Sequence, residues 1–169
     1  MDVIFLLGGV KMKRGFEKIS FEQFSKDVSN DKKLYNEYNL PKRQTKYSAG
    51  YDFFAIYDFV IKPGEVKKIP TGVKVWMQPD EMLMIVNRSS VGFKYNVRLC
   101  NQVGIIESDY YNNIDNEGHI WIAMQNHGDK DFTIKKGEHF VQGIFTKFLV
   151  VDDEDEILNE RTGGLGSTN

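Results

Sequence analysis

The sequence has one cysteine, no long hydrophobic run and no excess of basic charge. Its single cysteine, Cys100, cannot form a disulfide within the chain, which excludes a disulfide-stapled secreted scaffold. The 22 basic residues stand against 24 acidic ones, and a net charge of −2 excludes the basic surface that sequence-independent nucleic-acid binding requires. No segment approaches the ~20 apolar residues of a membrane span, and the apolar stretch Val3–Leu7 lacks the basic residues that precede a signal peptide's core. We therefore expect a cytoplasmic protein that binds neither nucleic acid nor membrane.

The length and composition fit one domain with a substantial core. A chain of 169 residues can bury roughly 70% of the surface that its unfolded form exposes. Hydrophobic residues make up 41% and charged residues 27%, which excludes a wholly disordered or low-complexity protein. Cys100 follows Val97, Arg98 and Leu99, which are typical of a strand, and we expect a buried thiol rather than a catalytic nucleophile.

One helix is indicated near the N-terminus, over residues 20–28. Ser20 can cap it, and Gln23 stands three residues on, in the position of a capping-box partner. Three apolar residues fall on one face: Phe21, Phe24 and Val28. The next segment, residues 30–46, is charged and rich in tyrosine and contains Pro41, so we expect an irregular connection there.

From residue 47 onward, short apolar runs alternate with turn residues. Four turns are marked by Pro, Gly and Asp: 62–65, 78–81, 127–130 and 135–138. Six strands are predicted between and beside them: 72–77, 82–87, 104–106, 119–125, 132–134 and 140–149. This spacing predicts an all-β sandwich or barrel, and no βαβ unit supports a dinucleotide-binding or P-loop fold.

Three polar clusters are candidate sites. Residues 87–90 (Asn-Arg-Ser-Ser) follow an apolar strand with donors that suit a phosphate; the alternative is a helix cap with a surface arginine. Residues 107–109 (Glu-Ser-Asp) carry two carboxylates that could hold Mg²⁺ or orient a water; the alternative is a plain turn. An acidic run at 152–156 precedes a glycine-rich tail, 161–169, which could wrap an anion or stay disordered.

Other catalytic or metal sites have little support. The three histidines, His119, His127 and His139, do not stand in a metal-ligand spacing with cysteine, so no zinc site is expected. We place His119 and His139 on strand faces or rims. No nucleophile elbow surrounds Ser89 or Ser90, so a Ser-His-Asp hydrolase is not supported.

Taken in order, the clusters resemble the trimeric dUTP pyrophosphatase (dUTPase) family, in which five short motifs follow a fixed order. The matching segments are AGYDFFA (49–55), NRSSVGFK (87–94), NQVGIIESDY (101–110), KGEHFVQ (136–142) and RTGGLGST (161–168). Five ordered motifs are far more specific than any one of them.

The resemblance implies a distorted jelly-roll β-barrel assembled as a homotrimer, with active sites built from motifs of different subunits. It divides the chain into an N-terminal extension with a short helix (1–46), a β jelly-roll catalytic domain (47–151) and an acidic linker with a mobile C-terminal arm (152–169). The arm would close over a neighbour's nucleotide.

The same resemblance implies a reaction, the hydrolysis of dUTP to dUMP and pyrophosphate, which keeps uracil out of DNA and supplies dUMP for thymidylate synthesis. A water oriented by Glu107 would attack in line, Ser89 would lie near the scissile bridge, and Asp52 would help hold Mg²⁺ through water, the triphosphate being the metal's main ligand. The residues implied to contact substrate are Arg88, Ser89, Ser90, Asn101, Gly104, Ile106, Tyr110, Gln142, Arg161, Leu165, Gly166, Ser167 and Thr168. Among them, Asn101 and the backbone around Gly104 would read uracil, and Tyr110 would pack under the deoxyribose and leave no room for a 2′-hydroxyl.

Three departures from the family pattern leave two alternatives open. Glu107 stands where Asp is usual, Leu165 where an aromatic residue is usual, and Glu138-His139 where Asp-Arg is common. One alternative is a catalytically weak dUTPase-like scaffold that binds a regulatory protein partner. The other is a dCTP deaminase relative, which Ala123 disfavours because it cannot shuttle a proton where that relative has glutamate.

Overall fold

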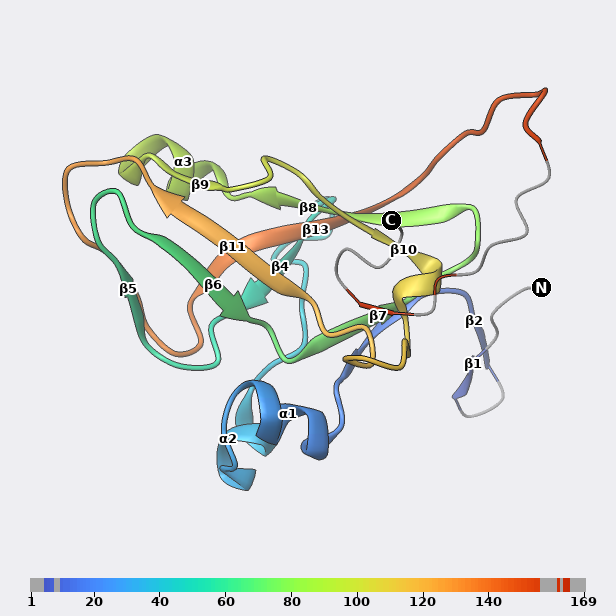
Figure 1. The fold of residues 1–169 in the computed structure, drawn as a ribbon, viewed down its shortest axis with the longest axis horizontal. Helices are drawn as coiled ribbons and strands as arrows, with labels where there is room; N and C mark the ends of the chain where they lie inside the picture. The colour runs from blue at the N-terminus through green and yellow to red at the C-terminus, as the bar shows by residue number, and fades with distance from the viewer. Residues whose placement is uncertain (1–4, 8–9, 156–160, 162, 165–169) are drawn as a thin grey trace.

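The structure is a computed structural model that describes residues 5–7, 10–155, 161 and 163–164. Its strands are β1 (Phe5–Leu7), β2 (Val10–Met12), β3 (Gly15–Lys18), β4 (Tyr51–Phe54), β5 (Phe59–Ile61), β6 (Val66–Pro70), β7 (Val73–Trp76), β8 (Glu81–Asn87), β9 (Val97–Leu99), β10 (Gly104–Glu107), β11 (Trp121–Asn126), β12 (Phe132–Ile134) and β13 (His139–Lys147). Its helices are α1 (Phe21–Asp27), α2 (Lys32–Glu37), α3 (Ser89–Tyr95) and the 3₁₀ turn η1 (Ser108–Tyr110). Figure 1 shows α1 and α2 on one side of the strands and α3 on the opposite side.

The strands form antiparallel sheets, which confirms the expected all-β fold. A four-stranded sheet runs β10-β8-β13-β4 and a three-stranded sheet runs β6-β11-β9, with β12-β5, β3-β7 and β1-β2 as separate pairs. The described strands do not close into a barrel, because the edge strands of the four-stranded sheet, β10 and β4, pair with no strand of another sheet. None of the helices in the described part of the chain is long and apolar enough to cross a bilayer.

The core lies between the sheets because their strands alternate buried and exposed side chains. β8 and β11 both follow this period of two along most of their length. Phe53, Leu83, Ile85, Met124 and Phe140 are all at most 1% exposed and belong to one hydrophobic cluster. Each side chain of this size contributes about 1.5–3 kcal/mol by leaving water, so this cluster is the main stabilising contact between the sheets.

Each of the six predicted strands is present, with ends shifted by up to two residues, and three predicted turns are closed by hydrogen bonds: 62–65, 78–81 and 135–138. Gly64 and Gly137 have φ of 78° and 81°, a conformation that glycine adopts without steric cost. The prediction missed β1, β2, β4 and β6, as well as β3, which pairs with β7, and β5, which pairs with β12. Each of these strands is at most five residues long, so each offers only a short stretch of pattern.

The predicted N-terminal helix is present, but the expected capping box is not. Ser20 caps α1 by accepting from the Gln23 N–H, yet the Gln23 side chain donates to Asp27 instead of completing a capping box.

The prediction that the segment 30–46 is irregular was wrong in part, because this segment contains the helix α2. Asp31 caps this helix by accepting from two backbone N–H groups, and α2 packs on α1 through aromatic rings.

The prediction of a buried thiol at Cys100 was also wrong, because Cys100 is exposed. Val97 and Leu99 are buried and Arg98 is exposed. Alternation continues past the end of β9, so Cys100 lies on the outward side with Arg98.

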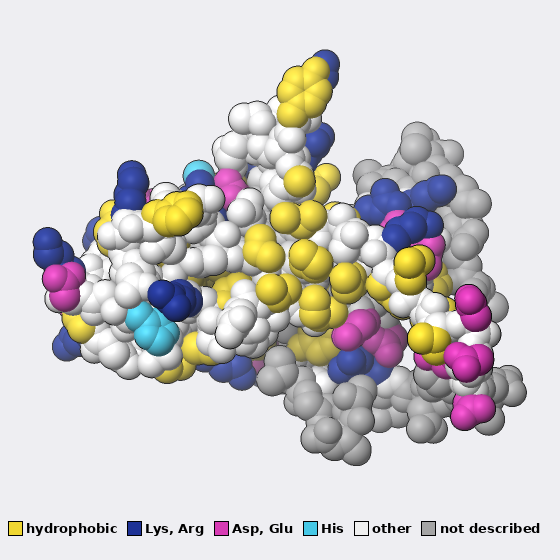
Figure 2. All heavy atoms as spheres, turned by 90° about the horizontal axis from the view of Figure 1, so that it is seen from above, with side chains coloured by type: hydrophobic (Ala, Val, Ile, Leu, Met, Phe, Trp, Pro, Cys, Tyr) yellow, Lys and Arg dark blue, Asp and Glu magenta, His cyan; other side chains and the backbone are white. Residues whose placement is uncertain are grey.

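An apolar region occupies the middle of the face seen in Figure 2, which looks down on the side that carries α3, β9 and β10 in Figure 1. The exposed large hydrophobic residues of α3, β10 and the loop before β10 are Phe93, Tyr95, Val103 and Ile105. These exposed apolar side chains give the region the composition of an interaction surface. The strand β10 is also an edge strand of its sheet, and such strands have backbone groups available for pairing with another chain.

Candidate functional site

Three segments far apart in sequence meet at one end of the four-stranded sheet. Asp52 of β4 lies opposite Gln142 of β13, and Gln142 lies opposite Val86 near the end of β8. The Arg88 Nε is 3.1 Å from Asp52 Oδ1, and Arg88 Nη1 donates to the His139 carbonyl at 3.1 Å. We call Asp52, Arg88, Ser89, Ser90 and Gln142 the phosphate-end cluster.

The backbone explains why these groups converge. Arg88 is extended, with φ −79° and ψ 139°, and α3 begins directly after it, so Ser89 and Ser90 form its first turn. The alternative interpretation of this segment was a helix cap with a surface arginine; Arg88 is the cap residue, but its side chain is held by Asp52. Gly50 matters as well, since a Cβ there would clash with the side chain of Gln142.

His139, expected on a strand face or rim, begins β13 and borders this cluster. Its Nδ1 is 3.5 Å from Asp52 Oδ2, and within the described residues neither this nitrogen nor Asn87 Oδ1 has a hydrogen-bond partner, although both are buried. Arg88, Ser90, Lys94 and His139 help line a pocket of about 420 Å³. Sequence reasoning missed His139 as a site residue; its place in the fourth motif, three residues before Gln142, was the available signal.

A second, more apolar pocket lies under the loop between β9 and β10. It has a volume of about 270 Å³, and its walls include Asn101, Gly104, Ile106, Trp121 and Ala123. The loop is tightly turned, with a hydrogen bond from the Val103 N–H to the Asn101 carbonyl. A pocket of this kind suits a flat, mainly apolar group whose edge is read by backbone and amide groups.

The paired carboxylates follow directly, where β10 becomes η1. Arg161 bridges them: its Nη2 is 3.1 Å from Glu107 Oε2 and its Nε is 3.1 Å from Asp109 Oδ1. The guanidinium carbon lies 5.7 Å from the centre of the Tyr110 ring. We call Glu107, Asp109, Tyr110 and Arg161, together with the pocket residues Asn101, Gly104 and Ile106, the base-end cluster.

Tyr110 is buried, and its hydroxyl is fully engaged. It donates to the His119 carbonyl at 3.1 Å and accepts from Asn116 Nδ2 at 2.9 Å. Burial raises the pKa of the Tyr110 hydroxyl, so it stays protonated and keeps its donor role.

The two clusters are far apart within one chain. In the β8–β10 register, Glu107 lies opposite Met82, whereas Arg88 comes six residues after Met82. At 3.3 Å per residue these groups are separated by ~20 Å along the sheet. The structure therefore joins the predicted residues into two groups rather than one. Leu165, Gly166, Ser167 and Thr168 lie outside the described residues.

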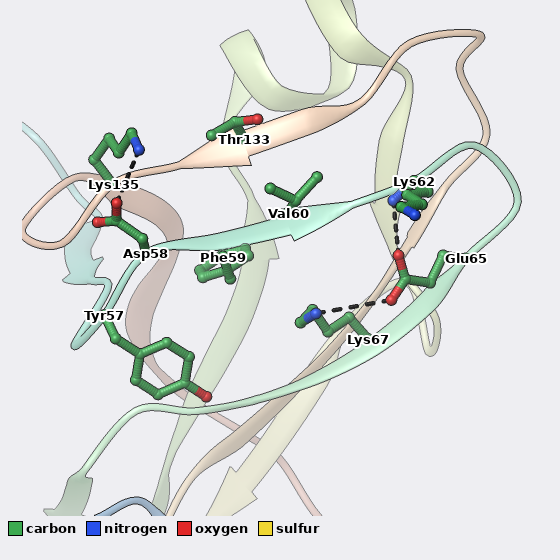
Figure 3. Close-up of a pocket in the computed structure, with 9 residues that line it drawn as sticks. All are labelled: Tyr57, Asp58, Phe59, Val60, Lys62, Glu65, Lys67, Thr133 and Lys135. Atoms are coloured by element: carbon green, nitrogen blue, oxygen red, sulfur yellow. Dashed lines mark hydrogen bonds and ion pairs between the residues drawn. The ribbon is translucent and has the colours of Figure 1, made fainter.

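A third hollow contains none of the predicted residues. Figure 3 shows this pocket of about 410 Å³, lined from β5, β6 and β12. Four of its charged side chains pair with each other, Lys135 with Asp58 at 2.8 Å and Lys67 with Glu65 at 3.7 Å, and Lys62 is the fifth charged residue in the lining. A single further lysine is a weak basis for binding a triphosphate.

The fold and these clusters define a β-sheet protein with a polar cluster around Arg88 at one end of its four-stranded sheet and a separate, more apolar pocket beside β10. A model of the dUTPase family matches residues 36–169. The chain is 52% identical over 131 residues to the deoxyuridine 5'-triphosphate nucleotidohydrolase of Lactococcus lactis, covering 77% of this chain and 87% of the relative. The corresponding Haemophilus influenzae protein (strain PittEE) is 37% identical over 145 residues, covering 80% and 91%. This chain belongs to the dUTPase family, and the resemblance seen in its motifs is confirmed.

Solved structures of dUTPases have the same fold as this chain. The dUTPase of Streptococcus mutans superposes with a TM-score of 0.66 at 41% identity, covering 82% of this chain and 98% of that one. A dUTPase variant from the Staphylococcus aureus phage phi11, in which a structural Mg(II) ion is coordinated, superposes with a TM-score of 0.63 at 17% identity, covering 88% and 98%. The second likeness concerns the fold alone.

Proposed function

We propose that this chain hydrolyses dUTP to dUMP and pyrophosphate at a site to which one copy contributes the phosphate-end cluster and another the base-end cluster. The activity is that of the dUTPase family, to which the chain belongs. The convergence of Asp52 from β4, Arg88 from the junction of β8 and α3, and Gln142 from β13 carries the assignment, because it places a cation and an amide where a triphosphate would bind. Ser89 and Ser90 add short hydroxyl donors beside them.

The phosphate end fits a hydrated Mg²⁺ that the triphosphate holds. Magnesium prefers oxygen ligands and keeps several waters, so one protein carboxylate beside substrate phosphates is enough. Asp52 would be that carboxylate: its Oδ1 faces Arg88, and its Oδ2 lies 3.5 Å from His139 Nδ1. Bound there, Mg²⁺ would neutralise the charge that develops on the departing pyrophosphate.

At the base end, the pocket beside Asn101, Gly104 and Ile106 would hold uracil, and the ring of Tyr110 would support the deoxyribose. Backbone groups in fixed positions would reject cytosine. Cytosine has a hydrogen-bond donor where uracil has an acceptor and an acceptor where uracil has a donor, so buried groups of the pocket would be left unpaired. Ala123 in the pocket wall offers no group that could transfer a proton, which disfavours deamination.

Glu107 would orient the attacking water. In the structure its carboxylate is occupied by Arg161. A triphosphate is a stronger competitor for a guanidinium than a half-exposed carboxylate, so substrate would draw Arg161 away and release Glu107. Leu165, Gly166, Ser167 and Thr168 would complete the nucleotide contacts as the arm closes.

A homotrimer would bring the two clusters together. The ~20 Å between Glu107 and Arg88 cannot be closed within one chain without breaking the β8–β10 pairing. Ile105, exposed on the edge strand β10, supplies apolar surface for a second copy to cover. Ile105→Glu should abolish both the trimer and activity, whereas Val66→Glu on β6 should leave both. A trimer that survives Ile105→Glu would place the interface elsewhere.

Two further assignments complete the proposal. The chain divides into the extension 1–46, the catalytic β domain 47–151 and the linker with arm 152–169. The exposed Cys100 thiol fits a reducing compartment, so we place the enzyme in the cytoplasm.

The deciding experiment incubates purified protein separately with dUTP, dCTP and UTP, with and without Mg²⁺, and separates the products by chromatography. We expect conversion of dUTP alone, to dUMP and pyrophosphate, and only with Mg²⁺. Binding of dUTP without turnover would instead support the dUTPase-like regulatory scaffold, and ammonia release from dCTP would support a deaminase.

A further inference from the structure

The N-terminal helix α1 lies before the part of the chain that matches the dUTPase family, which begins at residue 36. It is nevertheless joined by hydrogen bonds to the loop 111–118. The backbone N–H of Ser20, the α1 cap, donates to Glu117 Oε2 at 3.0 Å, and the Ser20 hydroxyl donates to the other oxygen of this carboxylate. Lys74 Nζ contacts the same carboxylate at 3.2 Å. Glu117 has a positive φ of 59°, so the loop adopts a conformation that needs such anchoring.

The other end of α1 holds the residue that follows this loop. Asp27 Oδ2 is 2.5 Å from Nδ1 of His119, whose side chain is fully buried, and the Gly72 N–H donates to His119 Nε2 at 2.9 Å. Because Nε2 accepts, Nδ1 must carry the proton and donate to Asp27. Gln23 also donates to Asp27 Oδ2, at 2.9 Å. The carboxylate of Asp27 therefore sets both the tautomer and the position of His119.

The same loop holds Tyr110 on its other side. The Tyr110 hydroxyl lies between the His119 carbonyl and the Asn116 amide, and Asn113 Nδ2 donates to the Tyr110 carbonyl at 2.8 Å. The loop also receives the arm, since the Gly164 N–H donates to Asp115 Oδ2 at 2.7 Å. The cap of α1, Tyr110 and the C-terminal segment that carries Gly164 thus all form hydrogen bonds with the loop 111–118.

We propose that α1 is a positioning element of the nucleotide site: Asp27 holds His119, and the Ser20 cap holds Glu117 of the loop 111–118, so that the Tyr110 ring stays at the depth that excludes a 2′-hydroxyl. This inference rests on the proposed function, in which Tyr110 packs under the deoxyribose. Asp27 and Glu117 do not touch the substrate. They act through the carbonyl of His119 and through the loop that carries Asn116.

The test compares Asp27→Asn and Glu117→Gln with a matched control, Glu22→Gln, on the exposed face of the same helix, where Glu22 pairs only with Lys26. For each protein, kcat and KM are measured with dUTP and with UTP. We expect the dUTP-over-UTP preference to fall roughly tenfold in the two test variants, the size expected for a looser fit around one small group, and to stay unchanged in the control. A folded, oligomeric Asp27→Asn protein with the original preference would overturn the proposal.

A double-mutant cycle separates positioning from general destabilisation. Tyr110→Phe removes the hydroxyl through which the loop holds the ring, so Asp27→Asn should add little to the loss of preference that Tyr110→Phe causes. Full additivity of the two effects would contradict the proposed route. If Asp27→Asn does not fold, the same cycle with Glu117→Gln decides.

A chain that fails to hydrolyse dUTP would refute the proposed function but not this inference. The preference would then be measured as binding of non-hydrolysable dUTP and UTP analogues to the same variants. Equal preference in all of them would overturn the positioning role.

Discussion

The guanidinium of Arg161 lies 3.1 Å from the carboxylate of Glu107. These residues stand 54 positions apart, one in the C-terminal segment and the other at the end of β10, so the substrate-free chain pairs the group that would orient water with a group that would bind phosphate. The pair keeps the Glu107 carboxylate occupied until an anion competes for Arg161.

Glu107→Gln should abolish turnover while nucleotide binding persists. The amide keeps the size of the side chain but loses the charge that orients and activates water, which we expect to cost at least about 10²-fold in kcat. Steady-state kinetics with dUTP and calorimetric binding of a non-hydrolysable analogue provide the two readings. Glu65→Gln, remote from both clusters, is the control. Near-normal kcat in the Glu107 variant would eliminate this residue as the base.

Deleting residues 159–169 should cut turnover severely and leave the oligomer intact. The deletion removes Arg161 and the Gly164 contact with Asp115, and neither of these described residues belongs to the hydrophobic core clusters. Size-exclusion chromatography with light scattering reports the oligomer, and the dUTP assay reports activity. If the truncated protein dissociates, the arm has a structural role in assembly.

Asp52→Asn should raise the Mg²⁺ concentration needed for half-maximal activity. The change removes the carboxylate proposed for the hydrated metal and leaves Arg88 without its ion pair, and losses of about 10–100-fold are typical for such supporting ligands. Asp58→Asn, which alters exposed contacts with Lys135 and with the Lys136 N–H, is the matched control. An unchanged Mg²⁺ titration would show that the metal does not need Asp52.

Stability should decrease as the pH falls below about 6.5, the ordinary pKa of histidine. Burial lowers the pKa of His119 in the folded state, against the opposing influence of Asp27. The unfolded chain therefore takes up a proton first, so the contribution is fully present above pH 6.5 and is lost as the pH falls, by at most about 1.4 kcal/mol per pH unit. Urea unfolding at pH 7.5, 6.5 and 5.5 measures the slope.

The same pH series on His119→Gln should show a shallower slope between pH 6.5 and 5.5, whereas His127→Gln, at an exposed position, should match the original protein. Carboxylates with lowered pKa, such as Glu81 and Glu117, protonate at lower pH and do not mask this window. Equal slopes for all three proteins would show that His119 takes up its proton equally in both states.

Local features of the sequence determined the elements that depend on local physics. The short apolar run 82–87 between turn residues predicted β8, the Pro-Gly turn at 62–65 predicted the turn before β6, and the Ser20 cap predicted α1. Five motifs in fixed order identified the family. These signals work because capping, turn conformation and short apolar runs involve residues close together in the chain.

Tertiary structure decided what depends on distant partners. The pairing of β3 with β7, the seating of α2 on α1 and the contact of Asp27 with His119 join segments whose own patterns are short or ambiguous. The register between β8 and β10 separates Glu107 from Arg88, although both belong to neighbouring motifs. No local pattern carries this information, because strand register is set by which side chains pack together across the sheet rather than by order along the chain.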